Sequence, residues 1–434
     1  MVESAVNQDP SGLAEGEPQI AEDPRNPATL FYDYTTMNYP PTKLTPPKAP
    51  CGGQASTDTG TSWHNAFVET PSTGVVVGCS DAVAAYGPDG TLYAGGIVIA
   101  SYKLVTDCTA PGVTKFGSLC LELSAYDGIV RSTDNGRTWG PAVKTMGSST
   151  AGTFDFAPGS GNPVQTFDRP WLAVDQSNGT VYAIGHNIAD HEGFVTTSTN
   201  KAKSFGTIYA IDSPSYPLGG TGGGDIAAAQ GVLAATYSAS SAPGAKCPCV
   251  VFETSTDHGS KWTRYVIPTV DGSQQPFPYV TADSGSKGHF AVTLLNASGT
   301  ENQVYVTANA GHTWQGPTNV AEAPKDQQFK QWISYGPTGE LALVWRTWHG
   351  PPTTSPYDVW AAIGKEESGK LVFSKPLHVN SSLAGYPPGY LAGDDFSFIL
   401  MDHHYVHVGW GDSRNGTPES YYARIPISTF KWAS

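Results

Sequence analysis

The sequence lacks any apolar run long enough to cross a bilayer, and it has little positive charge. Its longest apolar segments, such as residues 95–100, are the size of one strand, far below the roughly 18 residues of a membrane span. Lys and Arg number 24 against 38 Asp and Glu, which gives a net charge of −14. This charge repels phosphate backbones. We therefore expect no membrane span and no nucleic-acid partner.

The sequence also lacks a Cys-x-x-Cys pair and an apolar leader segment. Its first 18 residues are polar and acidic, which predicts that no signal peptide is present in this chain, although a removed one stays open. An even number of cysteines predicts disulfides of open connectivity and favours a secreted or periplasmic protein. The six are Cys51, Cys79, Cys108, Cys120, Cys247 and Cys249.

Turn-forming and aromatic residues, in contrast, are abundant. The chain holds 49 Gly and 34 Pro, and aromatics make up 11% of it, while charged residues make up only 14%. Frequent turn formers between aromatic-rich segments are typical of many short strands. We expect an all-β fold.

An octapeptide of the form Ser-x-Asp-x-Gly-x-x-Trp recurs along the chain. It is complete at Ser56–Trp63, Ser132–Trp139 and Ser255–Trp262, and altered at Ser198–Phe205 and Thr307–Trp314. An Asp or Asn side chain can accept backbone N–H bonds in a tight turn, Gly supplies positive φ, and the aromatic ring packs inward. The octapeptide therefore predicts a structural hairpin turn, not a catalytic element.

A second pattern, an apolar strand followed by a turn and another apolar strand, occurs seven times. The seven units begin near Glu17, Ser80, Asp168, Gly224, Phe277, Lys330 and Asp394. Dividing 434 residues by seven gives 62 residues per unit, enough for four strands and their loops. We predict an N-terminal extension over residues 1–16 and one repeat domain over residues 17–434.

The octapeptide resembles the Asp-box, or bacterial neuraminidase repeat, of the sialidase superfamily and related β-propellers. The resemblance implies a β-propeller of four-stranded blades. Sialidases have six blades, whereas the pattern here counts best as seven. We predict a seven-bladed propeller, with a six-bladed sialidase-like one as the alternative.

Candidate substrate-binding residues lie where the predicted strands reach the central funnel. They are Arg169, Arg346, Arg414, Trp348 and Asp225. Three guanidinium groups suit a carboxylate and resemble in number the arginine triad of sialidases. The family's Phe/Tyr-Arg-Ile-Pro motif is absent, however, so the resemblance does not assign the role of the triad to these three arginines. In the alternative interpretation, Arg169 pairs with Asp168 and Arg346 packs on Trp348.

Candidate catalytic residues come from the same strand ends. They are Asp168, His186, His191, Tyr279 and His349. The sialidase resemblance implies a Tyr nucleophile activated by a Glu, and no Glu stands in a recognisable family context. His186 and His191 lie near Asp168 and Arg169 in the predicted fold, an arrangement that also suits proton abstraction from a uronate sugar. Ordinary loop-anchoring histidines are the alternative.

Acidic residues at the funnel are candidate cation ligands. Asp394 and Asp395, with Asp225 and Asp168, are candidate ligands for Ca²⁺, and capping of strand ends is the alternative. No cofactor is expected to be required. Asp402–His404 with His407 could also suggest a metal site, but alternation along a strand sends His403 and Tyr405 to one face and His404 to the other, so no zinc site is expected there.

Three functions follow in order. The first is a secreted sialidase-like exo-glycosidase that acts on an acidic glycan in the central funnel. The second is a polysaccharide lyase that cleaves a uronate-containing glycan with His, Tyr and Arg. The third is a non-catalytic propeller that binds a glycan or a protein, because propellers host many functions. A monomer is expected.

Overall fold

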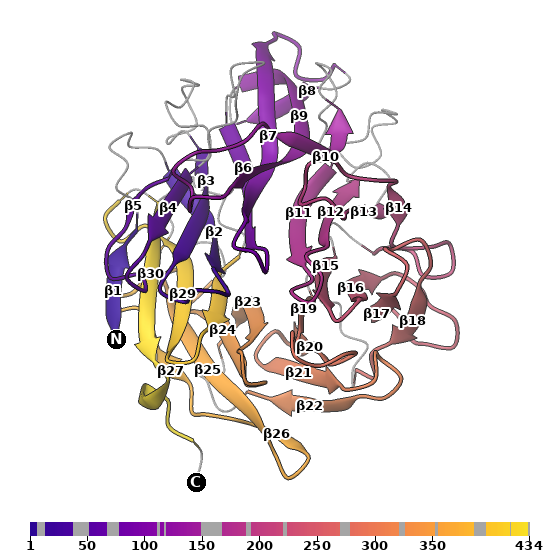
Figure 1. Cartoon of the computed structure of the whole chain (residues 1–434), viewed down its shortest axis with the longest axis vertical. Helices are drawn as coiled ribbons and strands as arrows, with labels where there is room; N and C mark the ends of the chain where they lie inside the picture. The colour runs from indigo at the N-terminus through magenta and orange to yellow at the C-terminus, as the bar shows by residue number, and fades with distance from the viewer. Residues whose placement is uncertain are drawn as a thin grey trace.

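The protein is a ring of seven β-sheet blades around a central axis (Figure 1). The structure is a computed structural model. It describes residues 1–6, 14–37, 52–66, 78–110, 113–116, 119–148, 167–187, 192–219, 224–269, 278–320, 326–351, 355–385, 396–416 and 418–432. The prediction of a seven-bladed, all-β propeller is confirmed.

Each blade holds four main antiparallel strands, and the first three blades follow in chain order. Blade 1 contains β2 (Ala14–Glu22), β3 (Leu30–Met37), β4 (Gly52–Ser56) and β5 (His64–Asn65). Blade 2 contains β6 (Gly78–Tyr86), β7 (Leu92–Leu104), β9 (Leu119–Ser132) and β10 (Val143–Ser148), with β8 (Val113–Phe116) added to β9. Blade 3 contains β11 (Phe167–Val174), β12 (Val181–Asn187), β13 (Glu192–Ser198) and β14 (Tyr209–Ala210).

The remaining blades repeat this arrangement. Blade 4 contains β15 (Asp225–Ala229), β16 (Val232–Ala239), β17 (Cys249–Ser255) and β18 (Thr263–Val266). Blade 5 contains β19 (Tyr279–Ala282), β20 (Phe290–Leu295), β21 (Asn302–Thr307) and β22 (Gln315–Asn319). Blade 6 contains β23 (Gln328–Tyr335), β24 (Leu341–Trp348), β25 (Tyr357–Glu367), β26 (Lys370–Phe373) and β27 (Leu377–His378).

The seventh blade joins the two ends of the chain. It contains β28 (Phe398–Met401), β29 (Tyr405–Asp412), β30 (Glu419–Pro426) and, as its outermost strand, β1 (Val2–Ala5). β1 runs antiparallel to β30, with Val2 opposite Arg424 and Ala5 opposite Tyr421. Figure 1 shows β1 beside the last strands of the chain. Residues 2–5, which lie in the predicted extension 1–16, therefore close the ring.

The first strand of each blade is the innermost one, and it starts at the same face of the ring. We call this the mouth face and the opposite one the base face. Second strands run back toward the mouth face, so β12 ends where β11 begins, with Asp168 opposite His186. Strand ends that are far apart in the sequence thus gather at one face.

Aromatic side chains of the inner strands fill the axis of the ring. The rings of Trp171 in blade 3 and Trp332 in blade 6 lie 5.1 Å apart, and Tyr279 of blade 5 lies 4.4 Å from Trp332. Phe396, beside blade 7, lies 4.9 Å from Trp171. These four residues, the aromatic plug, are at most 8% exposed. Burial of these large aromatic side chains stabilises the propeller and closes its central axis where they meet.

The octapeptides form one recurring turn between the third and fourth strands of blades 1 to 5, at the base face. In all five, the hydroxyl of the first residue accepts the N–H of the fifth at 2.9 Å. The closing ring packs on the preceding blade: Trp139 lies 5.6 Å from Phe31, and Trp314 lies 4.9 Å from Phe252. The turns are structural, as their chemistry predicts.

Two disulfides lie in the described part of the chain. Cys108 bonds to Cys120 between β7 and β9, and Cys247 bonds to Cys249 at the start of β17. Each disulfide therefore joins two cysteines that are close in the sequence, 12 and 2 residues apart. Among the described residues, no helix is long and apolar enough to cross a membrane.

Candidate functional site at the mouth face

Four inner strands begin with the same backbone irregularity. Each carries a β-bulge near its start, and one residue at the bulge has a φ of 51 to 52°. These residues are Glu17, Asp81, Arg169 and Lys330. Positive φ is uncommon for residues other than Gly, and such bulges often direct side chains at functional sites. All four belong to units whose starts the sequence predicts to face the funnel.

The bulges of blades 1, 2 and 3 are linked by carboxylates. Glu17 Oε2 accepts the hydroxyl of Thr35 at 2.8 Å and the backbone N–H of Asp81 at 3.0 Å. Asp81 Oδ2 in turn accepts the backbone N–H of Arg169 at 3.0 Å. Each side chain therefore stabilises the unusual backbone of the next blade, which fixes the position of Arg169.

Asp127 of β9 lies within this linked region. It is 1% exposed, and within the described part of the chain neither carboxylate oxygen has a hydrogen-bond partner. Burial, together with the negative charges of Asp168 and Asp81, holds the pKa of the Asp127 carboxyl well above its usual range. Asp127 therefore keeps a proton at pH values where ordinary carboxyls are ionised.

Asp168 and Arg169 lie nearer the surface than Asp127. Their side chains are 19% and 13% exposed, and Arg169 Nε lies 3.9 Å from Asp168 Oδ2. A nearby guanidinium favours the ionised carboxylate. The mouth of blades 2 and 3 thus combines a protonated acid, Asp127, with a carboxylate, Asp168, that reaches solvent.

His186 faces the same group from β12. It pairs directly with Asp168 across the two strands and is 2% exposed. Directly opposed residues of antiparallel strands have neighbouring side chains. The predicted proximity of His186, Asp168 and Arg169 is therefore found, while His191 lies outside the described residues.

Arg346 and Trp348, predicted to bind substrate, lie inside blade 6. Arg346 is 0% exposed, and its guanidinium donates to Ser397 Oγ at 2.8 Å and to the Phe396 carbonyl at 3.0 Å. Trp348 stacks on Phe329 with ring centres 4.0 Å apart. These contacts join blade 6 to blade 7 and pack its interior, and a substrate role for either residue stays a prediction.

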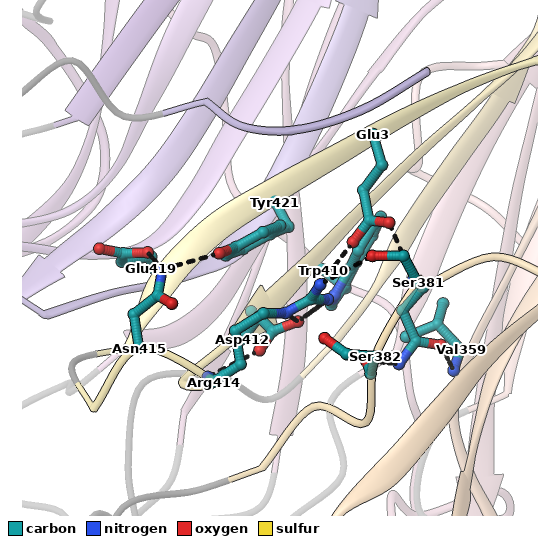
Figure 2. Close-up of polar contacts among 12 residues, drawn as sticks. Glu3, Val359, Ser381, Ser382, Trp410, Asp412, Arg414, Asn415, Glu419 and Tyr421 are labelled. Carbon is teal, nitrogen blue, oxygen red and sulfur yellow. Dashed lines mark hydrogen bonds and ion pairs between the residues drawn. The ribbon is translucent and has the colours of Figure 1, made fainter. Parts of the chain in front are cut away.

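Arg414 belongs to a separate group at the seventh blade (Figure 2). Its Nη1 lies 2.8 Å from Glu3 Oε1, and its Nε donates to Asp412 Oδ2 at 2.9 Å. The guanidinium also lies 4.4 Å from the ring centre of Tyr421. Arg414 therefore ties the N-terminal strand to the ring, and a substrate-binding role for it stays a prediction.

Tyr279 and Asp225 also have structural surroundings. Tyr279 is part of the aromatic plug and is 3% exposed. Asp225 accepts the backbone N–H of Ile226 and that of Val280, each at 2.8 Å, and so links blade 4 to blade 5. Burial raises the pKa of Asp225 to about 7, against the opposing effect of these two N–H groups. Catalytic or binding roles for these two residues stay predictions.

His349 lies in another cluster, on blade 6. Its Nε2 lies 2.6 Å from Asp358 Oδ2, and His378 Nε2 lies 2.7 Å from the other oxygen of the same carboxylate. His349 is 38% exposed, so it can reach solvent. Asp394 and Asp395, the predicted Ca²⁺ ligands, lie outside the described residues.

Sequence reasoning missed Asp127. Asp127 lies in β9 (Leu119–Ser132), where it is followed directly by Gly-Ile-Val. A charged residue inside a buried strand is a signal, because carboxylates are almost never fully buried without a partner. The aspartates that surround it come from blades 2 and 3, and their proximity depends on the ring.

Comparisons with known proteins show the fold. No protein-family model matches the chain, and no curated protein does. A protein of unknown function from Dyadobacter fermentans is 11% identical, with a TM-score of 0.52 over 98% of both chains. The GH93 α-L-arabinofuranosidase of Fusarium graminearum, in complex with arabinobiose, is 10% identical, with a TM-score of 0.52 over 99% of both chains. At these identities, the likeness establishes a shared propeller architecture.

Proposed function

We propose that the protein is a carbohydrate-active enzyme, a glycoside hydrolase whose active site lies at the mouth face between blades 2 and 3. The observation that carries this proposal is the buried carboxyl of Asp127, which has no hydrogen-bond partner among the described residues and lies near Asp81 and Asp168. Most glycoside hydrolases use two carboxyl groups, one protonated and one ionised. Environments that push two pKa values apart provide this pair.

In the proposed mechanism, Asp127 is the general acid that protonates the leaving oxygen. Asp168 is the carboxylate that either attacks the anomeric carbon or activates a water. Arg169 Nε lies 3.9 Å from Asp168 Oδ2, where its positive charge favours the ionised carboxylate. The carboxylate of Asp81 fixes the backbone of Arg169, so it is a positioning residue.

The proposed substrate is a glycan, and the acidic, sialidase-like substrate of our first prediction remains part of the proposal through Arg169. Of the three predicted arginines, Arg169 lies beside the proposed catalytic residue Asp168. Arg346 and Arg414 instead contact groups of blades 6 and 7 and the N-terminal strand. The octapeptides resemble Asp-boxes of the sialidase superfamily. The arabinofuranosidase with the same architecture supports including neutral furanosides in the test.

A uronate lyase is the second candidate, because His186 lies directly opposite Asp168. A neutral imidazole beside a carboxylate is suited to proton abstraction. A lyase releases an unsaturated, ultraviolet-absorbing uronate, whereas a hydrolase releases a saturated sugar.

The test is incubation of the whole chain with aryl arabinofuranosides, sialosides and uronic-acid polysaccharides, followed by mass spectrometry and absorbance. We expect a saturated sugar, with kcat reduced about 100-fold or more in Asp127→Asn and Asp168→Asn. The control is Glu367→Gln, whose side chain is 55% exposed at the base-face end of β25 in blade 6. Product formation at the wild-type rate by Asp168→Asn would refute the proposal. Binding without any product would favour the non-catalytic propeller.

A further inference from the structure

A second cluster of charged side chains lies at the opposite face, between the first and last blades. Glu22 ends β2 of blade 1, Asp402 directly follows β28 in blade 7, and His407 lies in the neighbouring strand β29. One oxygen or nitrogen from each side chain lies within 4.8 Å of the other two. Asp402 is 3% exposed and His407 is 0% exposed. A buried carboxylate, a buried imidazole and the partly buried carboxylate of Glu22 are thus gathered at one place.

The carboxylate of Glu22 has an unused position in this cluster. Its Oε2 is buried and has no hydrogen-bond partner among the residues that the structure describes. A buried carboxylate oxygen without a donor is costly in free energy. A cation at the centre of the cluster would satisfy it.

The other two side chains are already oriented. Asp402 Oδ1 accepts the backbone N–H of Tyr405 at 2.6 Å, which directs its Oδ2 at His407 Nε2, 3.0 Å away. The Nδ1 of His407 lies 2.6 Å from the hydroxyl of Tyr422. Metal-binding histidines are commonly held by such a contact at the second ring nitrogen.

We propose that Glu22, Asp402 and His407 form a divalent-cation site that joins blade 1 to blade 7. An ion about 2.0–2.2 Å from each donor holds the donors roughly 3–4 Å apart, so modest side-chain adjustment suffices. Mixed nitrogen and oxygen donors favour Zn²⁺ or Mn²⁺ over Ca²⁺, which takes six to eight oxygen ligands.

The protons of the cluster can rearrange to accept the ion. When the ion binds Nε2 of His407, the imidazole proton lies on Nδ1 and is donated to Tyr422 Oη. The hydroxyl proton of Tyr422 then has the Thr59 carbonyl, 3.5 Å away, as its acceptor. Tyr422 therefore acts as a positioning residue for the imidazole.

Strand alternation over Asp402–His404 with His407 predicts no zinc site there, but residues 402–404 form the turn between β28 and β29, so alternation does not govern their side chains. The proposed ligands are Asp402 and His407, and the third ligand comes from Glu22, at the other end of the chain. The site is independent of the proposed hydrolase, because it lies on the base face, where the inner strands end.

The test uses the whole chain, stripped with a chelator and then supplied with ZnCl₂, MnCl₂ or CaCl₂. We expect about one equivalent of Zn²⁺ or Mn²⁺ to stay bound after desalting, by elemental analysis, and the melting temperature to rise. Glu22→Gln should weaken the binding at least about tenfold and remove the metal-dependent rise. Glu340→Gln makes the same chemical change in the β23–β24 turn of the base face and should behave as wild type.

Tyr422→Phe provides a second variant that keeps the aromatic packing against Trp63 and Tyr32. It should lower the affinity about 10- to 100-fold without removing a ligand, which keeps the test decisive even if Glu22→Gln does not fold. Wild-type protein that retains neither Zn²⁺ nor Mn²⁺ would overturn the proposal. Equal retention by wild type and Glu22→Gln would also overturn it.

Discussion

The carboxylate of Asp81, in blade 2, accepts the backbone N–H of Arg169, in blade 3, at 3.0 Å. Arg169 has a φ of 51°, so the contact stabilises a backbone conformation that its own side chain disfavours. The same relation holds one blade earlier, where Glu17 accepts the N–H of Asp81. Position of the catalytic candidates therefore depends on contacts between blades.

Replacing Asp81 by Ala should lower the free energy of unfolding by about 1–3 kcal/mol, because the partly buried backbone N–H of Arg169 loses its acceptor. Urea denaturation measures the change. Glu367→Ala is the control: this residue is 55% exposed and pairs with Lys365 at the surface, and it should have little effect. Equal losses in the two variants would show that the link between blades adds no stability.

Asp225 should make stability depend on pH in a direction opposite to that of ordinary carboxylates. Its pKa is raised to about 7 by burial, compared with about 3.9 in an unfolded chain. Between these values the folded protein holds a proton that the unfolded chain has released. The contribution of Asp225 to stability is therefore complete below about pH 4 and is lost as the pH rises toward 7.

The comparison of wild type with Asp225→Asn isolates this contribution. The wild-type advantage in unfolding free energy should shrink by up to about 4 kcal/mol between pH 4 and pH 7. This interval separates the pKa of Asp225 in the unfolded chain from its pKa of about 7 in the folded protein. Denaturation at several pH values measures it. A difference that stays constant or grows with pH would mean that Asp225 is ionised throughout, held by the N–H groups of Ile226 and Val280.

Two glycines of blade 4 form a matched pair for testing the octapeptide turns. Gly231 and Gly259 both have positive φ, 76° and 87°. A Cβ on Gly231 meets nothing within 4 Å, whereas one on Gly259 lies 2.5 Å from Val195 Cγ1 of blade 3. Gly231→Ala should cost about 1 kcal/mol from strain alone, and Gly259→Ala about 1–3 kcal/mol more, measured by urea denaturation. Equal costs would contradict close packing of the turn on the neighbouring blade.

Removal of residues 1–6 should destabilise the whole ring. β1 supplies the outer strand of blade 7, Glu3 pairs with Arg414 at 2.8 Å, and Val6 is 0% exposed in the core between blades 1 and 7. Loss of the buried Val6 side chain alone costs about 1.5–3 kcal/mol. Thermal melting of the truncated chain measures the effect, and Glu3→Gln separates the ion pair from the strand. An unchanged melting temperature after truncation would show that β1 does not hold the ring closed.

The architecture was predictable because its signals are local. Alternating apolar strands, turn residues and the octapeptides repeat along the chain, and each reports on a structure of a few residues. Even the altered copy at Ser198–Phe205 keeps the turn, because Ser198 Oγ accepts the N–H of Ala202 at the same 2.9 Å as in the complete copies. Counting these signals is enough to find seven blades.

The site was only partly predictable, because its contacts join distant strands. The pairing of Asp168 with His186 lies within one hairpin and follows from the pattern. The approach of Asp127 to Asp168 depends on how blades 2 and 3 pack. Burial of Arg346 against Phe396 likewise depends on the packing of blades 6 and 7. Sequence patterns carry no information on how blades pack against each other. The sequence therefore could not predict the burial of Arg346, and it gave no reason to place Asp127 in the candidate site.

The aromatic plug closes the central channel of the propeller on one side of the mouth face. Trp171, Tyr279, Trp332 and Phe396 meet across the axis, so a polymer cannot be threaded lengthwise through the molecule at that level. Whatever binds at the mouth face must arrive and depart through one entrance. For the proposed hydrolase, departure of the product and entry of the next substrate would therefore share one route.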